Sequence, residues 1–297
     1  MLAAAGLAAA LALAAGGGWQ LDAVGESGIP ASVVEGSAHI EIAVVDTGAD
    51  LSVPEIAARS PRTYDVRNGS ANVRDENGHG TFVTSLAAAF GGSARLLVIK
   101  AGSSSGAFTD DLEAKAIRYA IAHGARVINL SIGGPTTSRT ERAAIRFAVS
   151  HGALVVTAAG NDHSQGNPVE YPAALVQPVG SDGSGSSGLV VASSDNGRRA
   201  SFSGSGSWIS VAAPGVDVYG ALSGHRYGYG SGTSFSTAEV SGAAALVWGA
   251  DPSLTAQQVA RILEQTASGH GKWNPELGWG VVDVAAAVAR ARATAVR

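Results

Sequence analysis

The chain has 297 residues, of which 45% are hydrophobic and 15% are charged, and its formal net charge is −4 at pH 7. This composition excludes a disordered or highly charged protein and gives no reason to expect nucleic acid or an anionic membrane as a partner. The absence of cysteine excludes disulfides, thiol nucleophiles and cysteine-bound zinc. The length allows one large α/β domain or two small ones.

The chain begins with an uncharged run of Ala, Leu and Gly, residues 1–18, and its first basic residue is Arg59. Ala12-Leu13-Ala14 resembles a small-residue cleavage site, so we predict a signal-like leader, although a basic region in front of it is missing. A membrane anchor and a segment packed on the domain are the alternatives, since the run is only weakly apolar. We therefore expect a secreted or cell-envelope protein that touches a membrane only if the leader stays attached.

Short apolar runs recur along the rest of the chain and are typical of strands buried on both faces of a parallel sheet. These runs are residues 41–48, 96–100, 126–130, 153–158, 189–192 and 208–212. Stretches with helical spacing alternate with them or follow them, at residues 110–123, 140–151, 254–265 and 284–293. We predict a three-layer, doubly wound α/β fold, with a mostly parallel sheet and helices on both faces. Residues 19–297 are expected to form one domain, with residues 180–188 as a surface loop.

Four polar residues lie where these elements begin or end: Asp46, His79, Asn161 and Ser234. Each alone has a structural interpretation, as a turn residue, a satisfied histidine or a helix N-cap. Together they are the parts of nucleophilic acyl transfer. A hydroxyl needs a base, the base needs a carboxylate that fixes its tautomer, and the oxyanion needs preorganised donors.

Four motifs surround these residues in the order Val44-Val45-Asp46-Thr47-Gly48, Gly78-His79-Gly80-Thr81-Phe82-Val83, Ala159-Gly160-Asn161 and Gly232-Thr233-Ser234-Phe235. The chain thereby resembles the subtilisin-family serine proteases (subtilases), from about residue 19 to residue 287. The resemblance implies a serine endopeptidase that cleaves extended polypeptides through an acyl-enzyme. Ser234 would be the nucleophile, His79 the general base and then acid, and Asp46 the residue that orients His79. The Asn161 side chain and the Ser234 N–H would form the oxyanion hole.

The resemblance also implies where substrate lies. Leu130, Ser131, Ile132 and Gly133 match the family's edge segment, which pairs with an extended substrate, and Ala158, Ala159 and Gly160 are expected to contact it too. Glu170 falls at the floor of the first specificity pocket and Asp162 at its rim. We hypothesise that these acids favour Lys or Arg at P1, the residue before the cleaved bond. The alternative is that the insertion at residues 180–188 moves Glu170 into solvent.

No metal or cofactor is required for this chemistry. Structural calcium is possible in the family but is not predicted here. Glu55 matches one carboxylate of the family's calcium site, but the stretch after His79 is too short for the calcium loop. A monomer acting on polypeptide substrates is expected. The alternatives are a catalytically silent subtilase-like binding protein and an aspartic protease using Asp46, which would need Asp182 as its second aspartate.

Overall fold

The computed structural model describes residues 18–184 and 188–295. The predicted leader therefore lies outside the described residues, apart from Gly18. Among the described residues, no helix has the length and apolar character needed to cross a membrane.

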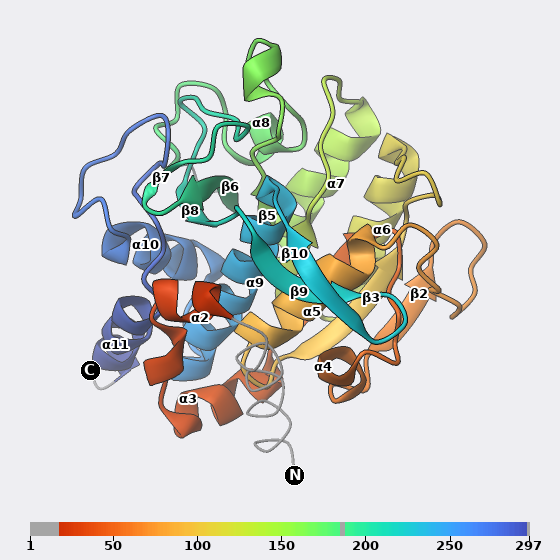
Figure 1. Cartoon of the computed structure of the whole chain (residues 1–297), viewed down its shortest axis with the longest axis horizontal. Helices are drawn as coiled ribbons and strands as arrows, with labels where there is room; N and C mark the ends of the chain where they lie inside the picture. Colours follow the sequence, from red (N-terminus) through yellow and green to blue (C-terminus); the bar gives the residue numbers. More distant parts are fainter. Residues whose placement is uncertain (1–17, 185–187, 296–297) are drawn as a thin grey trace.

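A mostly parallel sheet forms the middle layer of the molecule (Figure 1). Its order is β2-β3-β1-β4-β5-β6-β7, with β8 paired to β6, and only β7 is antiparallel to its neighbour. The strands are β1 (Glu41–Asp46), β2 (Arg62–Asp65), β3 (Arg95–Lys100), β4 (Val127–Leu130), β5 (Leu154–Ala158), β6 (Gly188–Asp195), β7 (Arg198–Arg199) and β8 (Val211–Pro214). The predicted α/β class and mostly parallel sheet are confirmed.

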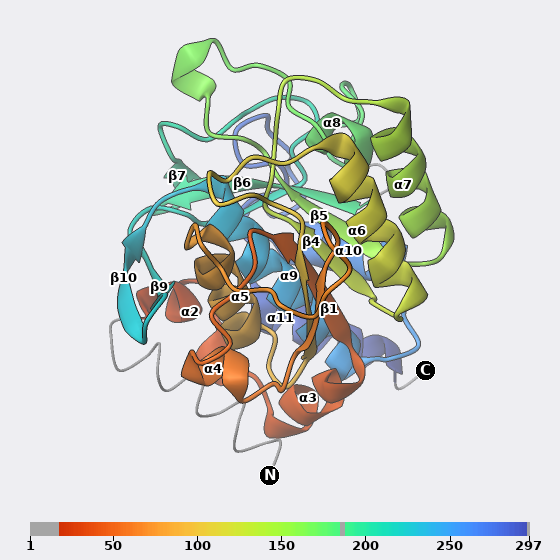
Figure 2. The same ribbon diagram turned by 90° about the vertical axis from the view of Figure 1, so that its right-hand side faces the viewer.

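Helices cover both faces of the sheet (Figure 2). One face packs against α6 (Asp110–Ala122), α7 (Arg139–Ser150) and α8 (Ala173–Val176). The other packs against α5 (His79–Phe90), α9 (Thr233–Ala250), α10 (Ala256–Thr266) and α11 (Val284–Ala295). The short helices α2 (Trp19–Ala23), α3 (Ala31–Gly36) and α4 (Pro54–Ala57) lie around this second layer.

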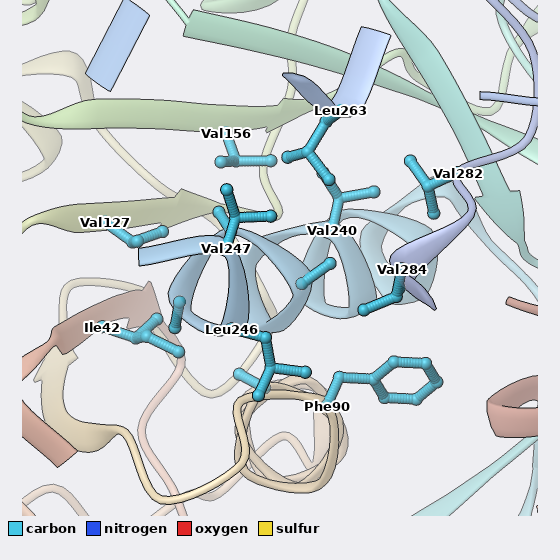
Figure 3. Packing of buried hydrophobic residues seen from close by; sticks show 14 of the residues in the cluster. Ile42, Phe90, Val127, Val156, Val240, Leu246, Val247, Leu263, Val282 and Val284 are labelled. Carbon is cyan, nitrogen blue, oxygen red and sulfur yellow. The ribbon is translucent and has the colours of Figure 1, made fainter. Parts of the chain in front are cut away.

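Helix α9 is the centre of the second layer (Figure 3). Its apolar side chains meet strand residues, α5 and α10 in one buried cluster that includes Ile42, Phe90, Val127, Val156, Val240, Leu246, Val247 and Leu263. Burying each large aliphatic side chain contributes about 1.5–3 kcal/mol. Because the helix is packed on several sides, its first turn, which carries Ser234, is held firmly against the sheet.

The parallel topology gathers the ends of distant segments at one edge of the sheet. Asp46 ends β1, Leu130 ends β4 and Ala158 ends β5, and these strands are neighbours. Helices that cross back over a parallel sheet begin at this carboxyl edge, so α5 starts there with His79. The carboxyl edge is where sites form in open α/β sheets.

The sequence prediction was incomplete at the C-terminal side of the sheet. The strand expected at residues 208–212 begins only at Val211, because Trp208 lies in a turn after Gly206. The hairpin of β9 (Val218–Leu222) and β10 (Arg226–Gly230), which leads directly into α9, was not predicted. Its glycine- and tyrosine-rich sequence lacks the apolar runs that identified the buried strands.

Candidate active site

Buried Asp46 and half-buried His79 form a hydrogen-bonded pair at the carboxyl edge. Asp46 is 1% exposed, and its Oδ1 lies 2.8 Å from Nδ1 of His79. The same oxygen accepts the backbone N–H of Thr47 at 2.7 Å. Asp46 thus fixes the ring of His79 and places the proton of the imidazole on Nδ1, which leaves Nε2 free to act as a base.

The environment of His79 controls its protonation. Burial, the largest influence, lowers the pKa of His79, but the charge and hydrogen bond of Asp46 and the charge of Asp75 raise it more. The net result is a pKa above the ordinary value for histidine. His79 therefore loses its proton, and becomes able to act as a base, at a higher pH than a free imidazole does.

Ser234 lies in the first turn of α9, opposite Ser131. The Ser234 hydroxyl donates to the carbonyl oxygen of Ser131 at 3.2 Å, and the Ser131 hydroxyl donates to the carbonyl oxygen of Ser234 at 2.8 Å. Phe235 packs near the ring of His79, with centroids 6.0 Å apart. Within the described residues, no hydrogen bond joins Ser234 to His79. Catalytic hydrogen bonds often form only when substrate is bound.

Asn161 is fixed by its neighbour in the nucleophile turn. Its Oδ1 accepts the backbone N–H of Thr233 at 3.0 Å and the Thr233 hydroxyl at 3.1 Å. The acceptor of the amide is thereby used, and its N–H groups have no hydrogen-bond acceptor among the described residues. An amide held in this way can donate to an oxyanion that forms beside Ser234.

Asp75 connects the two catalytic loops and was not singled out from the sequence. Its carboxylate accepts five hydrogen bonds, of 2.6–3.0 Å, which come from the Thr47 hydroxyl, the N–H groups of Asn77, Gly78 and Thr81, and the Thr81 hydroxyl. Burial, the largest influence, raises the pKa of Asp75, but these donors together lower it below the ordinary value. Asp75 thus holds the segment after Asp46 against the turn that carries His79.

Two backbone segments border the place where substrate is expected. Ser131, Ile132 and Gly133 follow β4, and Ala158, Ala159 and Gly160 end β5 and lead to Asn161. Leu130 is a correction to the expected substrate contacts. It is fully buried and paired with β1 on one side and β5 on the other, so its backbone is already used inside the sheet.

Glu170 lies between the two segments. A Cβ atom on either Gly133 or Gly160 would meet its carboxylate, which would have to move. Gly160 also has a φ of +94°, which favours glycine. The residue is 7% exposed, and the alternative that placed it in solvent is wrong. Burial and then the charge of Asp162 raise the pKa of Glu170 to about 7. Within residues 18–184 and 188–295, no group donates a hydrogen bond to this carboxylate.

The structure also tests two other expectations. Asp182 lies on an exposed turn and accepts the Ser184 hydroxyl, so it does not pair with Asp46 as an aspartic protease requires. Glu55 accepts the Tyr227 hydroxyl at 2.7 Å, and its pKa is raised by burial. The described residues contain no group of three or more His, Cys, Asp or Glu side chains placed to hold a metal.

Comparisons with known proteins show which family the chain is similar to. The subtilase family model matches residues 37–280. The chain is 36% identical over 246 residues to a thermophilic serine proteinase of Bacillus sp. (strain AK1), covering 79% of this chain and 58% of that protein. It is 35% identical over 260 residues to subtilisin E of Bacillus subtilis (strain 168), covering 84% of this chain and 65% of that protein.

A solved structure is also similar, the crystal structure of a cold adapted subtilisin-like serine proteinase. Its TM-score is 0.71 at 26% identity, and the match covers 82% of this chain and 88% of that chain. The chain spans about six tenths of the length of the two curated relatives described above. On the extent of the family match and on these identities, the chain belongs to the subtilase family.

Proposed function

We propose that this protein is a serine endopeptidase that hydrolyses extended polypeptides. The observation that carries the proposal is the hydrogen-bonded Asp46–His79 pair near the turn that carries Ser234, with the Asn161 amide fixed to that turn through Thr233. A hydroxyl, a base, an orienting carboxylate and an oxyanion donor are the complete set that acyl transfer needs. A leader-like run at residues 1–18 supports a secreted or cell-envelope enzyme.

In the proposed reaction, Nε2 of His79 takes the proton of the Ser234 hydroxyl as Oγ attacks the carbonyl carbon of the substrate. The negative oxygen of the tetrahedral intermediate accepts hydrogen bonds from the Asn161 amide and the Ser234 N–H. His79 then gives its proton to the leaving amine, and the C–N bond breaks to leave an acyl-enzyme. Water, activated by His79, releases the acyl group and restores Ser234.

The triad of Asp46, His79 and Ser234 and the oxyanion hole would both contribute to kcat. In a subtilisin, loss of the serine or histidine costs about 2 × 10⁶ in kcat, and loss of the oxyanion asparagine costs about 10²–10³. Because this chain belongs to the same family, Ser234→Ala and Asn161→Ala are expected to show losses of these orders.

We further propose that the enzyme favours Lys or Arg at P1. Glu170 supports this preference. Its carboxylate lies between the segments that contain Gly133 and Gly160, is nearly buried, and has no hydrogen-bond donor among the described residues. A buried carboxylate without a partner is costly, and a substrate cation would supply the partner. Asp162 adds a second negative charge nearby.

The test combines labelling with cleavage. A serine-directed fluorophosphonate should label the chain once, at Ser234, and the Ser234→Ala variant should neither be labelled nor cleave peptides. Peptides that differ only at P1 should be cleaved with kcat/KM for Lys above that for Phe. A folded chain without labelling or turnover would leave the silent binding protein as the function, and a preference for Phe would exclude the basic P1 pocket.

A further inference from the structure

A cavity with a volume of about 520 Å³ lies where three loops meet beside Asp75. Its walls come from residues 49–52 after β1, residues 71–75 before α5, and residues 223–224 at the tip of hairpin β9–β10. The volume lies within the range of roughly 300–1,000 Å³ that is typical of small-molecule pockets. Of the described residues that line it, none belongs to the triad or to the oxyanion hole. We call it the loop cavity.

Hydrogen bonds join the three loops to one another. The N–H of Ala49 donates to the carbonyl oxygen of Val73 at 2.9 Å, and the N–H of Gly224 donates to Oδ2 of Asp50 at 2.8 Å. The N–H of Asp50 donates to the hydroxyl of Thr81 in α5 at 3.0 Å. The cavity is therefore preformed, and a ligand that enters it does not have to order a loop, which limits the entropy cost of binding.

The two carboxylates in the lining are already satisfied by the protein. Asp50 accepts the N–H of Gly224 and both the N–H and the hydroxyl of Ser52. The hydrogen bond from Gly224 is the largest influence on the pKa of Asp50, which is lowered below the ordinary value. Asp75 accepts the five hydrogen bonds described above. Both groups are thus anions that need no further partner from a ligand.

Arg74 is the basic residue of the lining, and its charge is unpaired. Its N–H donates to Oδ1 of Asn72 at 3.1 Å and its carbonyl oxygen accepts Nζ of Lys100, but its exposed guanidinium has no partner among the described residues. The neighbouring acid Glu76 is paired with Lys100 at 3.4 Å instead. Nδ2 of Asn72 also has no acceptor within the described parts of the chain. The loop cavity therefore offers an anion one cation and one amide donor.

Leu51 gives the same cavity an apolar wall. It is 39% exposed and is one of four large hydrophobic side chains that stay exposed among the described residues. Ala49, Ala71 and Val73 also line the cavity. Covering exposed apolar surface is favourable, so the lining suits a ligand with an apolar chain as well as an anionic group.

The charges of the lining favour a carboxylate over a phosphate. The single guanidinium of Arg74 shares the cavity with the charged carboxylates of Asp50 and Asp75, so a ligand with two negative charges is repelled. A carboxylate carries one charge and matches the planar guanidinium through two parallel hydrogen bonds.

We propose that the loop cavity binds a monoanionic apolar carboxylate, with its carboxylate group on Arg74 and its apolar chain against Leu51. The site is separate from the peptidase reaction and does not depend on it. The same chemistry is present in a free carboxylic acid and in the C-terminal residue of a peptide, since both combine a carboxylate with an apolar chain.

The loop cavity adjoins the network that positions His79. Asp50 donates to the Thr81 hydroxyl, which donates to Asp75 at 2.6 Å, and Asp75 accepts the Thr47 hydroxyl beside the catalytic aspartate. A ligand that binds only the folded arrangement of these loops stabilises the folded state according to its concentration and Kd.

Binding to the Ser234→Ala variant, which cannot cleave peptide probes, tests the site. The probes are hexanoate and hexanamide, and N-acetylglycyl-leucine with a free or an amidated C-terminus, titrated by NMR. We expect each acid to bind about tenfold more tightly than its amide, because the amide loses the charged hydrogen bonds to Arg74. Adding Arg74→Gln should remove this difference, and adding Leu51→Ser should weaken both acids about threefold. Binding of both acids supports a site for apolar carboxylates in general, and binding of the peptide acid alone supports a site for a peptide C-terminus.

Arg292→Gln is the matched control, because Arg292 is an exposed residue of α11 whose side chain also has no partner in the described part of the chain. It should leave the Kd values unchanged. Thermal unfolding gives a second measurement, in which hexanoate should raise the Tm of the unmodified chain but not that of Arg74→Gln. Equal Kd values for acids and amides, or binding of the acids that persists in Arg74→Gln, would overturn the site. Inorganic phosphate that binds as tightly as hexanoate would also overturn it.

Discussion

Asp75 and Glu170 lie on two sides of the catalytic residues and are almost equally buried, at 9% and 7% exposed, yet their carboxyl groups behave in opposite ways. Asp75 accepts five hydrogen bonds, which hold its pKa below the ordinary value although burial opposes this. Glu170 receives none from the described residues, and burial and Asp162 raise its pKa to about 7. Burial alone therefore does not decide the charge of a carboxyl group; the donors around it do.

The difference distinguishes a carboxylate that positions loops from a carboxylate that binds a ligand. A carboxylate that holds two loops together is saturated by the protein itself, whereas one that awaits a ligand is left open. The position of an unpaired acid matters as well, because Glu239 in α9 also has two buried oxygens without partners. Glu239 is fully buried in the middle of the core, where burial raises its pKa well above the ordinary value. Only unpaired acids at the cleft are candidates for substrate binding.

Replacing Asp75 should have the largest effect. Asp75→Ala leaves five donors unpaired between the loops of Asp46 and His79, so we expect unfolding free energy to fall by about 3–5 kcal/mol. Loss of its negative charge should also lower the pKa of His79, so the acid limb of kcat/KM moves to lower pH while the rate falls. Urea unfolding and a pH–rate profile measure these changes. Glu276→Ala is the control, because Glu276 is exposed and its side chain has no hydrogen bond or ion pair among the described residues. Equal stability of the two variants would contradict the positioning role.

Replacing Glu170 should change selectivity more than stability. Glu170→Gln keeps the shape but removes the charge, so we expect the ratio of kcat/KM for Lys over Phe at P1 to fall about 10- to 100-fold. Peptides that differ only at P1 measure the ratio. Asp162→Asn is the paired variant, and its effect should be smaller, because Asp162 acts on Glu170 from the rim. An unchanged ratio in Glu170→Gln would mean that this carboxylate does not meet the P1 side chain.

Much of the fold and of the reaction centre could be predicted from the sequence. Buried parallel strands appear as apolar runs, and the polar residues at their ends, such as Asp46 and Asn161, interrupt the pattern visibly. Hairpin β9–β10 was not predicted because its two half-buried strands, rich in glycine and tyrosine, contain no such run. Leu130 was misplaced because the sequence does not show where pairing inside the sheet ends and the free segment begins.

The burial and the hydrogen-bond partners of the acidic residues could not be predicted in the same way. Asp75 lies in a polar stretch where any of several acids could face solvent, and only the fold brings Thr47 and Thr81 to it. Glu113 and Glu141 are separated by β4 in the chain and look like ordinary charged residues of two helices. Their burial depends on how α6 and α7 pack, which no local pattern records.

The pH dependence of selectivity should be smaller than the effect of the Glu170 variant. The pKa of Glu170 is about 7, so its carboxyl is largely protonated at pH 6 and charged at pH 8. The ratio of kcat/KM for Lys over Phe should therefore rise several-fold across this range. Titration of His79 affects both substrates alike and cancels in the ratio. A flat ratio in the unmodified enzyme, or the same rise in Glu170→Gln, would contradict the assignment.

The smallest expected effect is on the free energy of unfolding, whose dependence on pH should have opposite signs for Glu170 and Asp75. A raised pKa means that the folded state binds more protons, so the stability that Glu170 contributes is present below its unfolded pKa and is lost as pH rises to about 7. For Asp75, with a lowered pKa, stability is present above the unfolded pKa and is lost as pH falls through the folded one. Glu170→Gln should therefore gain about 1 kcal/mol relative to the unmodified chain between pH 5 and pH 8, reduced from the full shift by solvent screening. Urea unfolding at both pH values measures this, and Glu276→Gln, at an exposed residue without a side-chain partner among the described residues, should show no such gain. A gain of equal size at the two pH values would mean that the Glu170 carboxylate is not destabilised by its charge, and the distinction from Asp75 would fail.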